Sequence, residues 1–361
     1  MTVRLSSVAS SAAAALGVTG YRDELGLGEV QHAVIVLIDG LGWHQLAEHR
    51  QHAPVVAALA GGTASAPFPT TTPVGIASLG TGLEPGGHGL VGASFWLPEE
   101  AAVLTPLHWG SAPHPLAVQP EPTVFETAAR SGIAVASIGP AAYANSGLTR
   151  AVLRGADYLA AEGIVDRAAH LRAQVGGTGK TLSYVYWPQL DRLGHEHGVG
   201  SAAWLAGLRQ VDHLVEALLA SLPPATTVVI TADHGMVNAV EDERIAIESI
   251  PALREGVAHI AGEPRARHVY ARPGAAADVA ARWHELLDGR AQVSTRDEVL
   301  ASGILGDVDP ALVDRLGDVV AVALGGTVLA SRVDPLVSSL IGQHGALTDA
   351  ETQVPALVHS T

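Results

Sequence analysis

Val34-Ile35-Val36-Leu37-Ile38-Asp39-Gly40 reads as a buried strand followed by an acidic residue and a turn. Its first five residues form an unbroken apolar run rich in β-branched side chains, which is typical of a parallel strand covered on both faces. In open α/β sheets, ligands bind at the carboxyl ends of the strands. Asp39 therefore belongs either to a cation site or to the cap of a following helix, and this stretch alone leaves both interpretations open.

Further apolar runs along the chain predict an α/β fold with a mostly parallel central sheet and helices on both faces. Strands are expected at 133–138, 181–187, 226–231 and, close to the C-terminus, 354–358. Helices are expected at 123–131 and 202–222, and a single helical stretch is expected to follow the polar loop 146–150 and to end near 175. The Ala/Ser-rich stretch 6–16 lacks the aliphatic centre of a signal peptide, so we expect the first helix there.

The composition shifts between about residue 240 and residue 334, which predicts a smaller inserted α/β subdomain at 241–334. The catalytic core would then comprise residues 1–240 and 335–361. Within the insertion we expect strands at 267–272 and 319–324 and a helix at 275–287. Its histidines, His259, His268 and His284, stand alone in the sequence, so we interpret them as core or surface residues rather than metal ligands.

The chain carries a formal net charge of −15 and has no cysteine among its 361 residues. The negative charge argues against non-specific binding to nucleic acid or to a membrane surface, although divalent metals would reverse the field locally. Without cysteine, disulfides and thiolate zinc sites are impossible. No uninterrupted apolar window of about 18 residues predicts a membrane span, so we expect a cytoplasmic protein. The oligomeric state is not fixed by the sequence.

A loop of small hydroxyl residues, Phe68-Pro69-Thr70-Thr71-Thr72-Pro73, runs into an apolar segment. Pro73 suits the first position of a helix, and Thr72 would then be the N-cap. A hydroxyl at a helix N-terminus lies where backbone N–H groups and the helix dipole favour negative charge, which suits attack on a phosphoryl group. An ordinary capped loop is the alternative. No Lys or Arg occurs from 51 to 129, so a phosphate site here needs metals or charge from elsewhere in the fold.

Three more segments near predicted strand ends carry Asp, His or both. Asp191 and His195 are four residues apart, so on a helix both side chains point the same way. Asp233 and His234 directly follow a strand, and His344 lies in a loop before the last strand. Carboxylates with imidazoles suit zinc or a similar divalent ion, whereas a surface Asp–His pair is the simpler interpretation of Asp191 and His195 alone.

Together these motifs have the composition of a two-metal phosphoryl-transfer site. The chain resembles the alkaline phosphatase superfamily, and most closely its nucleotide pyrophosphatase/phosphodiesterase branch. The matching stretches occur in the family's order and span positions 38 to 345. They are Ile38–Gly40, Phe68–Thr72, Thr81–Gly89, Asp191–Gly198, Thr231–Met236 and His344–Gly345.

The resemblance implies two divalent metal ions, expected to be zinc, and a threonine nucleophile. One ion would be held by Asp191, His195 and His344, and the other by Asp39, Asp233 and His234. Thr72 would contact the second ion and form a phospho-threonine intermediate. Counting back from Thr81-Gly82 to Pro69 selects Thr72 over Thr71.

Two departures from the family pattern bear on the substrate. Pro73-Val74-Gly75 follows the expected nucleophile where the family often has Phe-Pro-Asn, and Ala93 stands where the family has an Asn that donates to a phosphoryl oxygen. Backbone N–H groups at the start of the Thr72 helix would take over part of that role.

We therefore expect a metal-dependent hydrolase of phosphodiester or phosphoanhydride bonds. Its partner would be a small phosphorylated substrate, with nucleotides as candidates, and not a nucleic-acid polymer or a membrane. A phosphomonoesterase or phosphonate hydrolase of the same superfamily is the alternative, and a non-catalytic zinc-binding protein is the hypothesis from another class. The lack of Cys and of a Ser-x-Pro-x-Arg element argues against a sulfatase.

Overall fold

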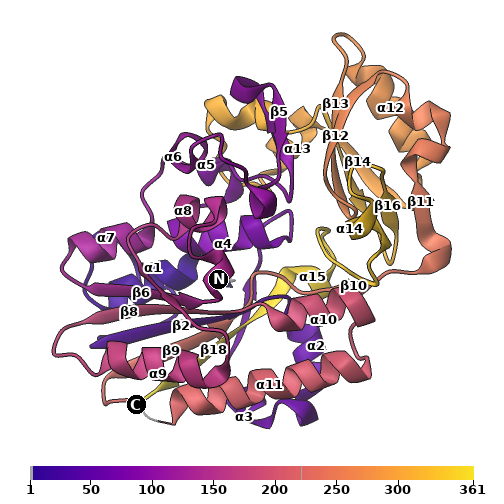
Figure 1. Cartoon of the computed structure of the whole chain (residues 1–361). Coiled ribbons are helices and arrows are strands. Elements are labelled where there is room, and N and C mark those ends of the chain that lie inside the picture. The colour runs from indigo at the N-terminus through magenta and orange to yellow at the C-terminus, as the bar shows by residue number, and fades with distance from the viewer. Residues whose placement is uncertain (1–2, 221) are drawn as a thin grey trace.

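A computed structural model describes residues 3–220 and 222–361, and an eight-stranded sheet forms its centre (Figure 1). From one edge to the other the strands are β1 (Val3–Arg4), β3 (Ala60–Ser65), β18 (Gln353–Ser360), β9 (Thr226–Thr231), β2 (His32–Ile38), β8 (Thr181–Trp187), β6 (Ala134–Gly139) and β7 (Asp157–Ala160). Neighbouring strands are parallel, except that β18 runs antiparallel to both β3 and β9. The mostly parallel sheet predicted from the apolar runs is confirmed.

Successive side chains of β2 enter two separate hydrophobic clusters, one on each face of the sheet. Val34, Val36 and Ile38 join one cluster, whereas Ile35 and Leu37 join the other. Alternation along a strand explains why an unbroken apolar run was needed here, since both faces are covered by helices. One face is covered by α1 (Ser6–Ala15), α4 (Thr72–Thr81), α7 (Val124–Arg130) and α8 (Gly147–Val152), and the other by α3 (Pro54–Ala57), α9 (Ile164–Val175), α10 (Gln189–His197) and α11 (Ala202–Leu219) (Figure 1).

The amphipathic pattern of α11 explains its place under the sheet. Ser201 caps the helix by accepting a hydrogen bond from the Trp204 N–H at 3.2 Å. Trp204, Leu208 and Val211 recur at helical spacing and are fully buried. The helix ends at Leu219, and position 221 of the expected range lies outside the described residues, as do positions 1 and 2.

A second, antiparallel sheet forms a small lobe beside the main sheet (Figure 1). Its strands, in spatial order, are β12 (Val257–Glu263), β13 (Ala266–Ala271), β15 (Val319–Ala323) and β14 (Ala291–Thr295), with helices α12 (Ala276–Leu286) and α13 (Arg296–Ser302). The lobe has its own hydrophobic cluster, which includes the fully buried Trp283. The boundaries at 241 and 334 stay a prediction.

Short elements connect these layers. They are α2 (Trp43–Glu48), α5 (Pro85–His88), α6 (Pro115–Val118), α14 (Pro335–Ser339), α15 (Asp349–Thr352), and the paired strands β4 (Phe95–Leu97) with β5 (Ala102–Leu104), β10 (Val237–Asn238) with β17 (Gly342–Gln343), and β11 (Arg244–Ala246) with β16 (Val328–Ala330). Over the residues that the structure describes, no helix has the length and apolarity to span a membrane.

The single helical stretch predicted to end near residue 175 is wrong, because strand β7 separates α8 from α9. This edge strand is four residues long, and none of its residues is buried, so it carries no apolar run. The edge strand β3 likewise has the small-residue sequence Ala-Gly-Gly-Thr-Ala-Ser, which lacks the apolar pattern on which strand prediction depends.

His268 of β13 joins the small lobe to the core. Its buried ring donates from Nε2 to the Val91 carbonyl at 2.9 Å and accepts at Nδ1 from the Gly317 N–H at 3.1 Å. Burial lowers the pKa of His268 to about 4, and Arg296 acts in the same direction. The neutral ring is therefore part of the folded junction.

Acidification should weaken this junction, because protonation of His268 removes the acceptor for the Gly317 N–H. Its contribution to the free energy of unfolding is fully present above 6.5, the ordinary pKa, and is lost as the pH falls towards about 4. We expect His268→Gln to be less stable than wild type at neutral pH but to lose less stability over this interval. Urea unfolding in the presence of a chelator measures both slopes. The exposed His213→Gln should follow wild type, and equal slopes for all three proteins would contradict the assignment.

Candidate active site

The three neighbouring strands β9, β2 and β8 bring acidic residues to one edge of the main sheet. Asp39 directly follows β2, Asp233 follows β9, and Asp191 lies in the first turn of α10, which follows β8. All three strands are parallel, so their carboxyl ends meet at the same edge. The loop after β17 adds His344 to this edge, and the start of α4 adds Thr72.

Asp191, His195 and His344 form a first group whose candidate ligand atoms all lie within 4.8 Å of one another. His195 Nε2 is 3.3 Å from Asp191 Oδ2, and His344 Nε2 is 3.9 Å from Asp191 Oδ1. The two histidine Nε2 atoms are 3.3 Å apart. These are the residues that the sequence assigned to the first ion.

Asp39, Asp191 and His234 form a second group that meets the same 4.8 Å criterion. Asp191 thus belongs to both groups, which the sequence did not predict. Asp233, expected in this group, lies beside it, with Oδ2 at 3.7 Å from His234 Nε2. Its other oxygen accepts hydrogen bonds from the N–H groups of Gly40 and His234 at 3.2 and 3.1 Å.

All three histidines have the same ring nitrogen turned to a backbone carbonyl. His195 Nδ1 contacts the Gly342 carbonyl at 2.8 Å, His234 Nδ1 the Gly235 carbonyl at 3.0 Å, and His344 Nδ1 the Thr70 carbonyl at 2.8 Å. Because a carbonyl only accepts hydrogen bonds, Nδ1 carries the proton in each neutral ring. Each Nε2 then presents a lone pair to the site.

The carboxylates at this edge repel one another in a buried environment. Burial, reinforced by Asp233 and Asp191, raises the pKa of Asp39 well above its usual range, and burial also raises the pKa of Asp233. Each of the three acids has a buried oxygen without a hydrogen-bond partner among the described residues: Asp39 Oδ1, Asp191 Oδ1 and Asp233 Oδ2. Unpaired carboxylate oxygens facing unprotonated Nε2 atoms suit divalent cations, so the residues present fit metal ions.

Thr72 is the first residue of α4 rather than its N-cap, which corrects the sequence prediction by one position. The Thr71 carbonyl accepts from the N–H groups of both Val74 and Gly75, at 3.0 and 2.9 Å, and these bonds begin the helix one residue earlier. Thr72 Oγ1 lies 3.2 Å from His234 Nε2. Among the described residues, the Thr72 N–H has no acceptor, as expected for a first helical turn.

Two glycines allow this close packing. A Cβ added to Gly75 would lie 2.7 Å from Asp233 Cβ, and one added to Gly40 would lie 3.0 Å from the Asp191 backbone. Gly40 also has a φ of +72°, which L side chains rarely adopt. The sequence Pro73-Val74-Gly75, which differs from the family pattern, is therefore explained by packing: Gly75 lets α4 approach the edge of the sheet that carries Asp233.

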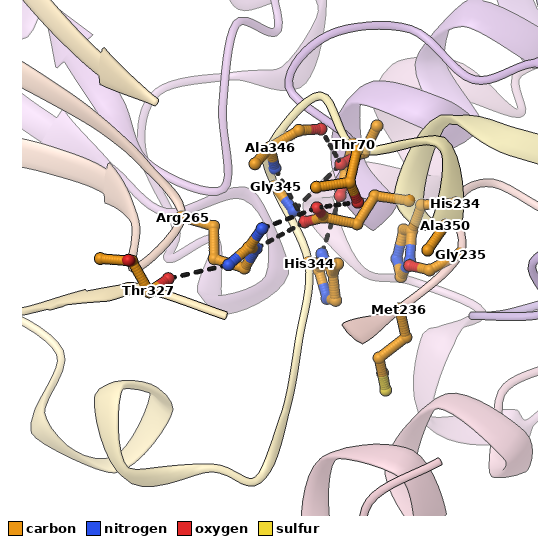
Figure 2. A network of polar contacts seen from close by, with 12 residues as sticks. Thr70, His234, Gly235, Met236, Arg265, Thr327, His344, Gly345, Ala346 and Ala350 are labelled. Carbon is orange, nitrogen blue, oxygen red and sulfur yellow. Dashed lines mark hydrogen bonds and ion pairs between the residues drawn. The ribbon is translucent and has the colours of Figure 1, made fainter. Parts of the chain in front are cut away.

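A hydrogen-bond network ties the threonine loop to the His344 loop (Figure 2). Thr70 Oγ1 donates to the Ala346 carbonyl at 2.9 Å and accepts from the Gly345 N–H at 3.0 Å. The Ala346 N–H donates to Glu351, which is paired with Arg265 of the small lobe at 2.7 Å. Thr70 thus holds the threonine loop and the His344 loop together.

Sequence reasoning missed four residues of this neighbourhood: Thr70, Tyr186, Glu263 and Glu351. The Tyr186 hydroxyl donates a short hydrogen bond to Asp39 Oδ2, and Glu263 lies in the cavity described below. Tyr186 lies near the end of β8, five residues before Asp191. Of these four residues, it alone could have been predicted as a site residue from its position in the sequence. The roles of the others depend on contacts between segments far apart in the chain.

Two cavities share Thr72, Asp191 and His195 in their linings. One has a volume of about 650 Å³ and is lined by tyrosines from the core, including Tyr184 and Tyr186. The other has a volume of about 1040 Å³ and lies between the core and β12 of the small lobe. A substrate at Thr72 therefore has room on both sides.

A mostly parallel sheet with Asp and His groups at its strand ends, beside a helix-initial threonine, is an alkaline-phosphatase-like fold, and the family model that matches the chain places it in the alkaline phosphatase superfamily. Within that class the chain belongs to the type I phosphodiesterase / nucleotide pyrophosphatase family, because the model of that family matches residues 33–347. Membership places the chain among the phosphoric ester hydrolases. The family implies divalent metal ions, and the two Asp/His groups are the candidate ligands.

Solved structures of low sequence identity share the fold. Human ectonucleotide pyrophosphatase / phosphodiesterase 5 has a TM-score of 0.74 at 18% identity, covering 91% of this chain and 87% of its own. The murine counterpart has a TM-score of 0.71 at 19% identity, covering 91% and 88%. Phosphonoacetate hydrolase from Sinorhizobium meliloti 1021, in complex with phosphonoformate, has a TM-score of 0.70 at 18% identity, covering 92% and 90%. No curated protein sequence matches the chain.

Two histidines of α10 offer a matched test of the first group. His195 faces Asp191 and His344, whereas the half-exposed His197 contacts Glu196 at 3.7 Å. We expect His195→Ala to weaken metal binding by more than about 100-fold, since loss of an orienting partner alone typically costs 10–100-fold. Elemental analysis after dialysis against a weak chelator should show less metal in His195→Ala and an unchanged content in His197→Ala. Equal metal loss, or none in either variant, would argue against the assignment.

Proposed function

We propose that this chain hydrolyses phosphodiester or phosphoanhydride bonds of small substrates, with Thr72 as the nucleophile at a two-metal site. The observation that carries the proposal is the position of the Thr72 hydroxyl, 3.2 Å from His234 Nε2 and beside two ligand groups that share Asp191. A free Thr72 N–H at the start of α4 accompanies that hydroxyl. A nucleophile and a donor for the phosphoryl group thus come from one residue.

Asp191, His195 and His344 would hold one ion, and Asp39, Asp233 and His234 the other. Imidazole and carboxylate ligands without sulfur suit zinc. Two ligands of a tetrahedral zinc ion, each about 2.0–2.1 Å from it, lie about 3.4 Å apart, and the Nε2 atoms of His195 and His344 are 3.3 Å apart. When bound, the ions would supply positive charge that lowers the pKa of a hydroxyl or water and offsets the charge of the phosphoryl group.

Thr72 Oγ1 would attack phosphorus in line with the leaving oxygen, and the bond to that oxygen would break as the new P–O bond forms. The hydroxyl proton is lost to solvent or to the leaving group. Water would then cleave the phospho-threonine, releasing the phosphoryl product and regenerating the hydroxyl. The Thr72 N–H and the dipole of α4 would stabilise negative charge on a non-bridging oxygen through both steps.

The choice of substrate rests on the cavities and on the relatives. The segment 51–129 has no Lys or Arg, but Arg192 lines one cavity and Arg254 and Arg272 line the other, so charge does not separate diesters from monoesters. Nucleotides are candidates, because an inactive threonine-to-alanine variant of the murine relative is described in complex with AMP. The cavities on both sides of Thr72 leave room for two substituents on phosphorus.

Phosphonate hydrolysis is the second candidate. The similarity to phosphonoacetate hydrolase in complex with phosphonoformate favours it, since that enzyme shares the fold over 92% of this chain. A panel of nitrophenyl phosphodiesters, nucleoside triphosphates, dinucleotides, nucleotide sugars, phosphomonoesters and phosphonoacetate separates the two. If phosphonoacetate is the one substrate that is hydrolysed, the chain is a phosphonate hydrolase and the diester proposal is wrong. If no substrate is hydrolysed, a non-catalytic metal-binding protein is favoured.

Replacement of Thr72 tests the nucleophile. We expect Thr72→Ala to lose at least about 1000-fold in kcat on a nitrophenyl phosphodiester, because the attacking oxygen is removed. The metal content should stay at about two ions per chain, because each ion keeps its three other ligands. Thr72→Ser should retain measurable turnover. Wild-type activity in Thr72→Ala with full metal content would show that another group attacks phosphorus.

A further inference from the structure

Tyr184 of β8 has a buried hydroxyl group without a hydrogen-bond partner. The residue is 1% exposed, and its hydroxyl contacts no donor or acceptor among the described residues. Two comparable tyrosines show the usual arrangement, because Tyr158 donates to the Pro140 carbonyl and Tyr270 to the Arg315 carbonyl, both at 2.7 Å. A buried hydroxyl without a partner destabilises a fold, so its presence at Tyr184 calls for an explanation outside folding.

The position of Tyr184 points to the substrate. It lines the cavity of about 650 Å³ whose lining also contains Thr72 and Asp39. Its ring lies almost parallel to that of Tyr186, with the ring centroids 6.3 Å apart and an angle of 12° between the planes. The Tyr186 hydroxyl donates to Asp39, so Tyr184 lies one strand repeat further into the cavity from the metal-ligand edge. A molecule bound at Thr72 that extends into this cavity therefore passes Tyr184.

The buried part of this cavity around Tyr184 is uncharged. Ser137 of β6 is the direct cross-strand partner of Tyr184, so both side chains project from the same face of the sheet, and both line the cavity. The buried Ile76, Leu148 and Leu153 add apolar side chains to the lining. Apart from the candidate metal ligands, the Asp, Glu and Arg residues of this lining are all solvent-exposed: Glu162, Arg192 and Glu196. The buried part therefore suits an uncharged group with a polar atom rather than an anion.

Packing explains the ring of Tyr184 but not its hydroxyl. The ring belongs to the hydrophobic cluster on one face of the main sheet, and its centroid is 6.1 Å from that of Phe125. A phenylalanine at this position would make the same apolar contacts. The hydroxyl, which both donates and accepts, is thus left for a ligand in the cavity.

We propose that Tyr184 is a specificity-determining residue, whose hydroxyl forms a hydrogen bond with a hydroxyl of an uncharged alcohol substituent on the substrate's phosphorus. This assignment rests on the proposed phosphoryl chemistry at Thr72 and specifies one of the two substituents of the diester. The substituent is a polyol or another alcohol with a second hydroxyl several bonds away from phosphorus. An alkyl group of the same length is a poorer substituent, because it leaves the Tyr184 hydroxyl buried and unpaired.

Two matched series of substrates test this role. One series consists of nitrophenyl phosphodiesters of butanol, pentanol and hexanol, and the other carries a hydroxyl at the end of each alkyl chain. In the zinc-loaded full chain we expect wild type to prefer the hydroxylated ester about tenfold in kcat/KM, at the chain length that reaches Tyr184, because one neutral hydrogen bond is gained. Tyr184→Phe should lose this preference, by hydrolysing the hydroxylated ester more slowly and the alkyl ester at least as fast as wild type. Tyr21→Phe, which lies outside both cavities, should keep the wild-type preference.

A second readout is independent of turnover. Binding of the alkyl phosphates and of their hydroxylated counterparts is measured by calorimetry on zinc-loaded Thr72→Ala, with and without Tyr184→Phe. The hydroxylated ligand should bind about tenfold more tightly than the alkyl ligand when Tyr184 is present, and equally tightly when it is replaced. If wild type hydrolyses no diester but this binding difference holds, the proposed function fails and the role of Tyr184 stands. If diesters are hydrolysed with the same preference in wild type and Tyr184→Phe, the role of Tyr184 is overturned and the proposed function stands.

The stability of Tyr184→Phe separates this role from a structural one. Its thermal midpoint, measured without metal or substrate, should equal or exceed that of wild type, because a buried hydroxyl without a partner is removed. A clear drop in the thermal midpoint would show that the hydroxyl is paired within the fold, and it would overturn the assignment.

Discussion

The crowding of three carboxylates at the ends of β2, β8 and β9 is the constraint on which the rest of the site depends. Burial and the neighbouring carboxylates raise the pKa of both Asp39 and Asp233, so the charged forms of these two acids are disfavoured unless cations lie nearby. Glycines at 40 and 75 permit the close approach, and backbone carbonyls fix each histidine with its lone pair inward. The fold thus stores an electrostatic cost that bound metal ions would relieve.

The small lobe takes part in this site through a buried ion pair. Arg265 and Glu351 are both fully buried and joined in two hydrogen bonds of 2.7 and 2.9 Å, and Glu351 also holds the Ala346 N–H beside His344. Loss of one partner would leave a buried charge, so this contact fixes the lobe against the His344 loop. The lobe and the threonine loop therefore meet at the same loop, where Glu351 accepts from the Ala346 N–H and the Thr70 carbonyl accepts from His344 Nδ1.

The parts of the fold that could be predicted are those with strong local signals. The apolar runs of β2, β8 and β9 predicted a buried parallel sheet, and the acidic residues after them predicted the edge of the sheet at which Asp and His side chains gather. The predicted N-cap of α4, Thr72, was wrong by one residue. Two hydrogen bonds to the Thr71 carbonyl make Thr71 the N-cap, and a sequence pattern does not reveal them. β7 was missed because it is short and exposed, and the shared position of Asp191 depends on how separate strands meet.

The stereochemical course at phosphorus tests the central claim most directly. Hydrolysis of a chiral phosphorothioate diester in isotopically labelled water reports how many displacements occur at phosphorus. A phospho-threonine at position 72 requires two in-line displacements, so the configuration should be retained. Inversion of configuration would mean that water attacks the substrate directly, and it would contradict a nucleophilic role for Thr72.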